Sequence, residues 1–266
     1  MSKKLVALLV AALPISAQAA TDTWDFSTGI FSGSGYGNTF TVAGASGTNN
    51  LTMTGWSDTG GSNDDILESG YLDYDTPKYS LTLQNQDHNV NGHSETSSPG
   101  HSIDNFGDWT DTDMVLLSFH QEVTLESLSI GWATEETKGY QADITVVGYT
   151  GKETITGLSG NKWEDMAAGS WNEVETLSNV QGESTRALST TVSSKYWLIG
   201  AFNVAFSGSG DGLSEGFKLS AVTGSTSNGG GGGGEVPAPN SVLLLLAGLL
   251  SLQAMKRKSR QAGIAA

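Results

Sequence analysis

The sequence predicts an all-β ectodomain, an antiparallel β-sandwich or jelly roll, with an N-terminal signal helix and one C-terminal transmembrane helix. Three observations lead to this fold class. Short stretches of alternating apolar and polar residues recur between clusters of Gly, Asn, Asp and Ser, which is typical of strands joined by turns. Long uncharged apolar segments occur only near the two ends of the 266-residue chain. Between those ends, Trp163–Ala168 alone has a pattern that indicates a helical turn.

The N-terminal segment has the pattern of a cleaved secretory signal. An apolar run, Leu5–Leu13, follows two lysines, and Ala17 and Ala19 are the small residues that signal peptidase recognises. The sequence therefore predicts a signal peptide over residues 1–19, with cleavage before Ala20. An uncleaved membrane anchor is the alternative, but the apolar run is too short to span a bilayer.

Strands are expected throughout residues 20–224, and the pattern predicts nine or ten of them. The clearest are Leu51–Thr54, Tyr79–Leu83, Met114–Phe119, Glu122–Trp132, Asp143–Thr150, Arg186–Val192, Tyr196–Ala205 and Phe217–Ala221. Met114–Phe119 is almost continuously apolar, as expected for a strand that is buried on both faces. Many short strands separated by turn residues favour a sandwich or a jelly roll.

In one predicted strand, the apolar residues switch from odd to even sequence positions partway along its length. Val123 and Leu125 are apolar at odd positions, whereas Leu128, Ile130 and Trp132 are apolar at even positions. Strand side chains alternate with a period of two. The switch therefore predicts one inserted residue between the two sets, as a bulge or as a tight turn.

The charge distribution separates the middle of the chain from its ends. The formal net charge is −15, yet six of the 13 Lys and Arg lie in the end segments, so 7 basic residues stand against 28 acidic ones in between. Such a surface repels nucleic acid and excludes a nucleic-acid partner. Because the chain has no cysteine, disulfides, thiol catalysis and thiolate metal sites are excluded as well.

The C-terminal residues combine a flexible linker, a proline motif, an apolar span and a basic stop. Residues 225–235 form a Gly-rich linker, and Ser241–Met255 is uncharged and apolar. The proline motif consists of Val236, Pro237, Ala238 and Pro239, and the basic cluster consists of Lys256, Arg257, Lys258 and Arg260. As a helix, the 15-residue span would be roughly 22 Å long, shorter than a hydrocarbon core of about 30 Å. It fits a temporary membrane hold with a cytoplasmic end better than the alternative, a permanent tail anchor.

Residues 236–260 resemble the C-terminal sorting signal of PEP-CTERM proteins, the substrates of exosortases in Gram-negative bacteria. The family's motif usually reads Pro-Glu-Pro, and here Ala238 replaces the glutamate. The resemblance implies that an inner-membrane intermediate is cut near Val236–Pro239 by an exosortase-like transpeptidase and then reaches the cell surface or the extracellular matrix. The implied partners are this transpeptidase, signal peptidase and, transiently, the membrane.

A second resemblance covers roughly residues 100–225. It rests on Asp104–Gly107, Met114–Phe119, Val123–Leu125, Ile130–Trp132, Val146–Gly151 and Phe217–Leu219. Together these segments are similar to a recurring ectodomain of exosortase-dependent surface proteins. The likeness implies a sandwich related in shape to carbohydrate-binding modules, and it brings no catalytic residues with it.

Two patterns that suggest catalysis or metal binding are better interpreted as turns and loops. Gly212–Gly216 matches a nucleophile elbow, but a Gly/Ser loop precedes it and a predicted strand follows, whereas the motif needs a strand before it and a helix after it. His88, His93 and His101 lie in a polar stretch whose spacing matches no zinc pattern, so we expect an exposed loop. No catalytic residue is assigned.

Oxygen-bearing side chains gather just before the strand predicted at Met114–Phe119. They are Asp104, Asn105, Asp108, Asp111 and Asp113. Ca²⁺ takes six to eight oxygen ligands, so a structural calcium site is one interpretation. The residues do not follow the Asp-x-Asp-x-Asp-Gly pattern, and solvated turns are the preferred interpretation. No other cofactor is expected.

Seven tryptophans could serve a core or a sugar site. Trp132 and Trp197 lie in predicted strands, where core packing is expected. Trp109, Trp163 and Trp171 have loop-like surroundings and are the candidates for stacking on the rings of an extracellular polysaccharide.

The sequence as a whole predicts an exported surface or matrix protein with a structural or adhesive role and no enzymatic activity. A secreted carbohydrate-binding module is the first alternative. A secreted hydrolase is the second, and it would need two carboxylates about 5–9.5 Å apart across a groove. Glu135 and Glu136 are adjacent in sequence, so in a strand they would point to opposite faces and make a poor pair.

Overall fold

The computed structural model describes residues 20–58, 65–75, 81–86, 101–106, 112–208 and 212–226. Several predictions concern residues outside these ranges: Ala17, Ala19, Asp108, Trp109, Asp111, the motif Val236–Pro239 and the basic cluster Lys256–Arg260. Among the described residues, no helix is long and apolar enough to cross a membrane. The predicted span Ser241–Met255 also lies outside them.

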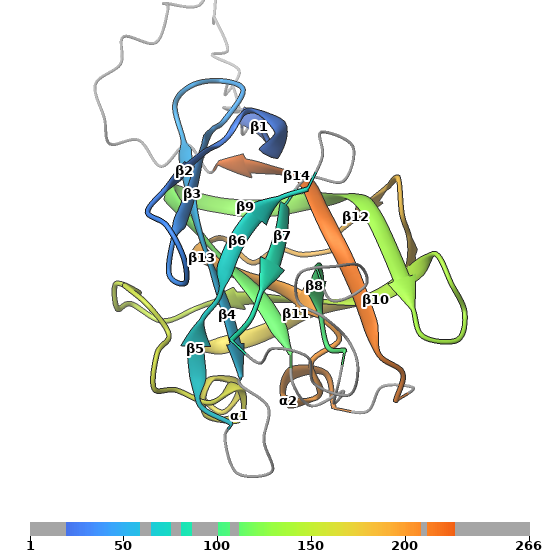
Figure 1. Ribbon diagram of the computed structural model, residues 1–266. Coiled ribbons are helices and arrows are strands. Elements are labelled where there is room, and N and C mark those ends of the chain that lie inside the picture. Colours follow the sequence, from blue (N-terminus) through green and yellow to red (C-terminus); the bar gives the residue numbers. More distant parts are fainter. Residues whose placement is uncertain are drawn as a thin grey trace, which may run out of the picture. The chain divides into compact units, whose positions relative to one another are not determined.

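The described residues form fourteen strands in one hydrogen-bonded sheet, with three short helices (Figure 1). The strands are β1 (Ala20–Asp25), β2 (Ile30–Ser32), β3 (Thr39–Ala43), β4 (Asn50–Asp58), β5 (Leu67–Ser69), β6 (Tyr71–Tyr74), β7 (Leu81–Gln84), β8 (Ile103–Asp104), β9 (Asp113–Glu135), β10 (Gln141–Tyr149), β11 (Trp171–Gln181), β12 (Ser184–Ala187), β13 (Ser194–Ala201) and β14 (Glu215–Thr226). The helices are η1 (Phe26–Thr28), α1 (Trp163–Ala167) and α2 (Val204–Ser207). The strand pairings are antiparallel, which confirms the all-β, antiparallel fold class.

The sheet is a single curled sheet. Its main path runs β11-β10-β13-β9-β14-β7-β6, and β9 is its longest strand. The first half of β9 pairs with β4 and β13, and its second half pairs with β14 and β12. One continuous strand therefore carries the hydrogen bonding from one part of the curl to the other, as the long green ribbon in Figure 1 shows.

The predicted inserted residue in β9 is a β-bulge. In the β9–β14 pair, Thr223 lies opposite Ser127 and the next residue, Gly224, lies opposite Leu125. Glu126 is left without an opposing residue, and the buried side chains change from odd to even positions there. The predicted inserted residue is confirmed, and of the two predicted forms it is the bulge and not the tight turn.

A second bulge lies five residues further along β9. Lys218 lies opposite Trp132, whereas Leu219 lies opposite Ile130, so Gly131 is the extra residue. The bulge turns Trp132 away from the face that Ile130 occupies. The core position predicted for Trp132 is therefore wrong, and its ring is half-buried.

Two hydrophobic cores use alternate residues of the same strands. On β9, Val115 and Leu117 belong to a core inside the curl, whereas Met114 and Leu116 belong to a second core. Helix α1 contributes Trp163 to this second core. Burial on both faces was predicted for this part of β9 and is confirmed, because each face packs against its own core.

The predicted strand Tyr196–Ala205 ends early. Strand β13 stops at Ala201, and helix α2 begins at Val204. The side chain of Asn203 accepts a hydrogen bond from the amide of Ala205 at 3.0 Å, and such an N-cap favours a helical turn over an extended chain. The helical turn predicted near Trp163 is confirmed by α1.

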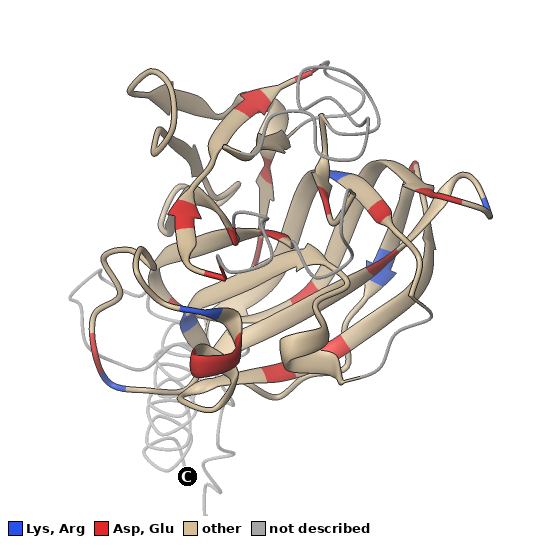
Figure 2. Ribbon diagram, turned by 60° about the horizontal axis from the view of Figure 1, so that its bottom comes forward, with Lys and Arg blue, Asp and Glu red and all other residues tan. Residues whose placement is uncertain are grey.

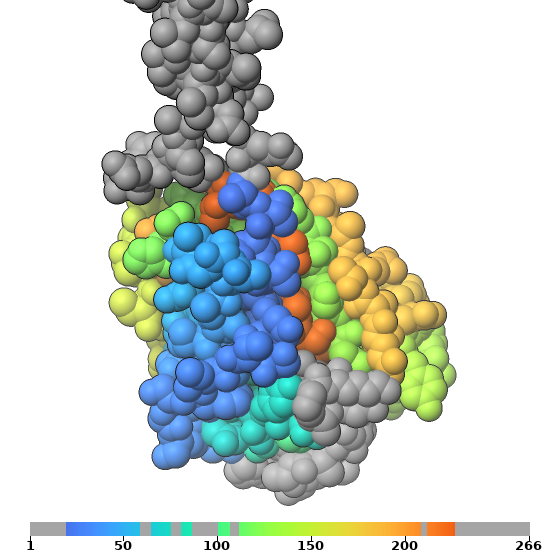
Figure 3. All heavy atoms as spheres, turned by 90° about the horizontal axis from the view of Figure 1, so that it is seen from above, coloured from blue at the N-terminus to red at the C-terminus, as the bar shows by residue number. Residues whose placement is uncertain are grey.

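The first and last strands of the described domain pair with each other. Ala20 of β1 lies opposite Thr226 of β14, and the register continues to Asp25 opposite Ala221. Figure 3 shows the orange β14 between the blue β1 and the green β9. Strand β14 extends two residues past the predicted domain end at position 224.

Candidate functional site

A hollow of about 420 Å³ opens where the end of β10 meets the start of β13. We call it the tyrosine groove, and we define it by Glu122, Tyr149, Lys152, Glu153, Lys195 and Tyr196. Its volume lies within the range of ligand pockets, about 300–1,000 Å³. Because β10 and β13 are antiparallel neighbours, the loop that follows β10 and the first residues of β13 meet at one edge of the sheet.

The backbone of the groove is held by close contacts. The Ser194 hydroxyl donates to the Tyr149 carbonyl at 2.7 Å and accepts from the Tyr196 amide at 3.0 Å. A Cβ atom at Gly151 would lie 2.2 Å from the Tyr149 hydroxyl oxygen, so the approach of this ring to the loop requires glycine. Ser194 therefore holds the backbone of the two tyrosines together, and Gly151 leaves the space that the Tyr149 ring occupies.

Three aromatic rings form a connected group beside the groove. The ring centroids of Tyr149 and Trp171 are 5.0 Å apart, and those of Tyr149 and Tyr196 are 6.0 Å apart at an interplanar angle of 71°. Both separations are favourable for aromatic pairs. Tyr149 is 7% exposed and Trp171 is 5% exposed, whereas Tyr196 is half-buried. Of these three rings, Tyr196 therefore offers the most surface to a ligand.

The charges in the groove are balanced. The Tyr149 hydroxyl donates a hydrogen bond to Glu153, which raises the pKa of Tyr149 and lowers the pKa of Glu153. At neutral pH, Glu153 is therefore an ionised acceptor. Lys152 and Lys195 are exposed, and neither forms an ion pair with another described residue.

These two lysines are two of only seven basic residues between Asp22 and Glu235. Figure 2 shows how sparse the basic positions are among the acidic ones. The groove therefore carries a larger share of positive charge than the domain around it.

A second hollow of about 310 Å³ adjoins the tyrosine groove. Tyr149 and Glu153 line both hollows, and the second one continues to Trp171 and to Asp165 and Met166 of α1. The two together are lined by aromatic, carboxylate and ammonium groups.

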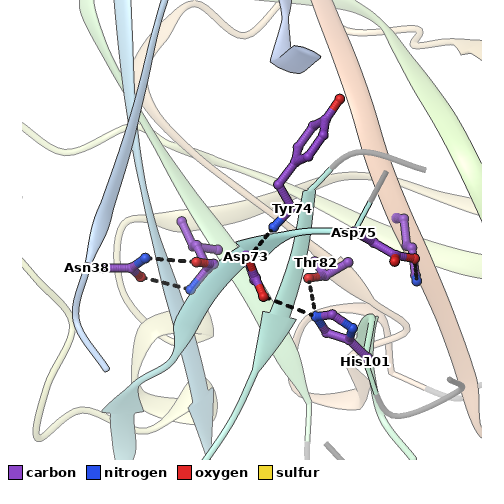
Figure 4. Close-up of polar contacts among 8 residues, drawn as sticks. Asn38, Asp73, Tyr74, Asp75, Thr82 and His101 are labelled. Atoms are coloured by element: carbon purple, nitrogen blue, oxygen red, sulfur yellow. Dashed lines mark hydrogen bonds and ion pairs between the residues drawn. The ribbon is translucent and has the colours of Figure 1, made fainter. Parts of the chain in front are cut away.

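A polar cluster surrounds His101, in the segment before β8 (Figure 4). The ring nitrogen Nε2 of His101 lies 2.9 Å from the Thr82 hydroxyl oxygen and 3.7 Å from a carboxylate oxygen of Asp73. A catalytic triad uses the two ring nitrogens of histidine separately, one toward the acid and one toward the nucleophile. Because both partners here face the same nitrogen, this cluster is not such a relay.

Lys218 and Asp75 complete the His101 cluster. The Lys218 ammonium forms an ion pair with Asp75 and lies 5.2 Å from the centroid of the Trp132 ring. Burial lowers the pKa of His101, and the charge of Lys218 lowers it further. The exposed loop expected at His101 is therefore wrong for this residue, since its ring contacts Asp73 of β6 and Thr82 of β7. His88 and His93 lie outside the described residues.

The described members of the predicted calcium loop are buried. Asp104 accepts a hydrogen bond from the Phe106 amide at 3.0 Å, and Asn105 accepts one from the Glu215 amide at 2.6 Å. Asp113 is also buried, so the solvated turn preferred from the sequence is wrong at these three positions. Within the ranges that the structure describes, no three His, Asp or Glu residues are placed to hold a metal ion. Calcium at this loop stays a prediction.

The predicted stacking tryptophans occupy different surroundings. Trp163 is 1% exposed and its indole N–H donates to the Thr112 carbonyl at 3.3 Å, so its ring cannot stack on a sugar. Trp171 lines the second hollow from a mostly buried position. Trp197 lies in the core, as predicted. The strand predicted after Gly212–Gly216 is confirmed, although β14 already begins at Glu215, so Glu215 and Gly216 belong to the strand and not to a turn.

Sequence reasoning missed Tyr149 and Tyr196. A local signal was present, since each lies at the end of a predicted strand and near one of the rare lysines. That the two tyrosines share a site depends on the pairing of β10 with β13, which no local pattern reveals. No protein-family model, curated protein or solved structure matched this chain.

Proposed function

We propose that this chain is an exported surface or extracellular-matrix protein of a Gram-negative bacterium, sorted and processed by an exosortase-like transpeptidase. Its role is structural or adhesive, and it catalyses no reaction of its own. The proposal is carried by the order of four features in the C-terminal sequence: a glycine linker, a Pro-x-Pro motif, a short apolar span and a basic cluster. Behind a predicted signal peptide, this order is typical of a precursor held in the membrane until it is cut.

The chemistry of the tail supports processing. Proline disfavours the helical conformation of the residue before it, so the sequence predicts an extended backbone at Val236 and Ala238, which suits a protease cleft. The glycine run gives the motif flexible reach from the domain. In this proposal, the short span and the basic cluster would hold the motif at the membrane surface.

The described domain is compatible with cleavage before Ala20. Cleavage there would keep all the residues of β1 that the structure describes, Ala20–Asp25, and their pairing with β14. We further propose that the curled sheet is a β-sandwich or jelly-roll ectodomain. The two cores on opposite faces of β9 support this description.

A carbohydrate-binding module is the second candidate, and the tyrosine groove favours it. A hydrolase is less well supported, although Glu122 and Glu153 both line the groove. A glycosidase needs a general acid whose pKa is raised. The hydrogen bond from Tyr149 lowers the pKa of Glu153 instead.

Export of motif variants in the native host tests the sorting proposal. We expect P237A/P239A to accumulate as a full-length membrane form on immunoblots. Gly232→Ser, in the adjacent linker, should be exported like the wild type. Ala238→Glu, which creates the usual Pro-Glu-Pro motif, should be processed at least as well. Unchanged export of P237A/P239A would refute the sorting proposal.

A further inference from the structure

We propose that the tyrosine groove binds a neutral polysaccharide chain. This inference rests on the adhesive part of the proposed function and supplies its ligand class. It does not depend on processing of the C-terminal tail, which the mass of the exported protein measures separately.

The shape of the site suits a chain molecule. The two hollows, about 420 and 310 Å³, share Tyr149 and Glu153 and so adjoin each other. A compact small molecule would need only one of them. A polymer of sugar rings could place successive units in both.

Tyr196 supplies the stacking surface. Its ring is half-buried, and the edge-to-face contact with Tyr149 at 6.0 Å holds it in place. Tyr149 is in turn packed against Trp171. The apolar C–H face of a pyranose can cover such a ring, and a ring that is already ordered loses little conformational entropy on binding.

The polar groups match the hydroxyls of a sugar. The hydrogen bond from Tyr149 engages one carboxylate oxygen of Glu153 and keeps this group ionised, so its remaining lone pairs can accept from sugar hydroxyls. Lys152 and Lys195, which pair with no described residue, can donate to sugar oxygens. Hydrogen bonds to ionised groups are the stronger kind.

The charge balance favours a neutral polymer. Two lysines and two glutamates line the groove, so a sugar carboxylate would meet both attraction and repulsion. Beyond the groove, the acidic excess of the domain repels polyanions at long range. An uncharged chain is repelled neither by the glutamates of the groove nor by the acidic residues of the rest of the domain.

Affinity electrophoresis and titration calorimetry on the full-length chain test this proposal. The neutral probes are soluble β-1,3-glucan, β-1,4-glucan, galactomannan and dextran, and the polyanion is alginate. We expect at least one neutral polymer to bind, alginate not to bind, and no new reducing ends to appear. Tyr196→Ala should weaken binding about tenfold or more, as loss of a central aromatic contact does, whereas Tyr196→Phe should retain most of it.

Two further variants separate binding from folding. Lys195→Gln changes an exposed side chain and should weaken binding several-fold without altering the urea unfolding curve. Tyr140→Ala removes a tyrosine that is 83% exposed and lies outside the groove, so binding should be unchanged. The proposal is overturned if no neutral polymer binds, if only alginate binds, or if Tyr196→Ala and Lys195→Gln leave the binding of the neutral polymer unchanged. Because the mass of the exported protein reports tail processing separately, failure here would leave the sorting proposal standing.

Discussion

Lys218 occupies a position that hydropathy alone would not give to a lysine. It is 2% exposed, yet its ammonium pairs with Asp75 and lies over the ring of Trp132. A buried charge is tolerated only when it is paired, and the bulge at Gly131 turns Trp132 to the side of the strand where it can contribute. The burial of the Lys218 ammonium therefore depends on the register of β9, which places Trp132, as well as on the ion pair with Asp75.

His101 should give the stability of the domain a pH dependence. Burial and Lys218 lower its pKa in the folded state below the value of 6.5 that applies when the chain is unfolded. The unfolded chain therefore binds the proton more readily. The stabilising contribution is complete above about pH 6.5 and is lost as the pH falls through the folded-state pKa. We expect the urea midpoint to fall more steeply between pH 7.5 and 5.5 in the wild type than in His101→Gln.

The matched control for this measurement is His120→Gln. His120 is exposed on β9, and its replacement should leave the wild-type slope intact. Equal slopes for His101→Gln and the wild type would show that His101 does not contribute, whatever the carboxylates of the domain do over the same range.

At the scale of elements, β9 organises the domain because it pairs with four other strands and its core-facing positions change parity twice. One strand of 23 residues pairs with β4 and β13 in its first half and with β14 and β12 in its second half. Each bulge, at Glu126 and at Gly131, switches the core-facing residues between odd and even positions, so the residues on both sides of it reach the same core. The register of β9 against β14 therefore decides which residues reach the core.

Deletion of Glu126 should be tolerated better than deletion of a paired residue of the same strand. Without the unpaired residue, Val123, Leu125, Leu128 and Ile130 stand at alternate positions of a regular strand, so all four keep the core face. Deletion of Thr124 instead makes Val123 and Leu125 adjacent and turns one of them out of the core, at about 1.5–3 kcal/mol. We expect a higher urea midpoint for the Glu126 deletion than for the Thr124 deletion.

Glu126→Ala is the control. It keeps the backbone carbonyl that accepts from Leu188 at 2.8 Å and should change stability by no more than about 0.5 kcal/mol. A Glu126 deletion that destabilises the domain as much as the Thr124 deletion would contradict the role given to the bulge.

These elements also show which features of the fold can be predicted from the local sequence. The alternation in β4 and the parity switch at Glu126 were readable, because each is a pattern within one strand. The bulge at Gly131 was hidden because Trp132 appeared to continue the alternation. Helix α2 was missed because the Asn203 cap interrupts an apolar run, and the tyrosine groove was missed because its two rings come from strands that are distant in sequence.

At the scale of the whole molecule, the chain separates its charges by position. Acidic residues are spread over the described domain (Figure 2), whereas the predicted signal and the C-terminal tail carry a basic excess. An acidic surface suits the proposed extracellular location, and the basic ends suit segments proposed to meet a membrane. This division matches a protein that is held at the membrane only while it is being exported.

Intact-mass analysis of the native protein from membrane and medium fractions tests this account most directly. The account predicts that the medium contains a species that begins at Ala20 and ends within Val236–Pro239, while the membrane fraction retains the precursor with its tail. A chain that keeps its C-terminal tail to Ala266 in both fractions would contradict it.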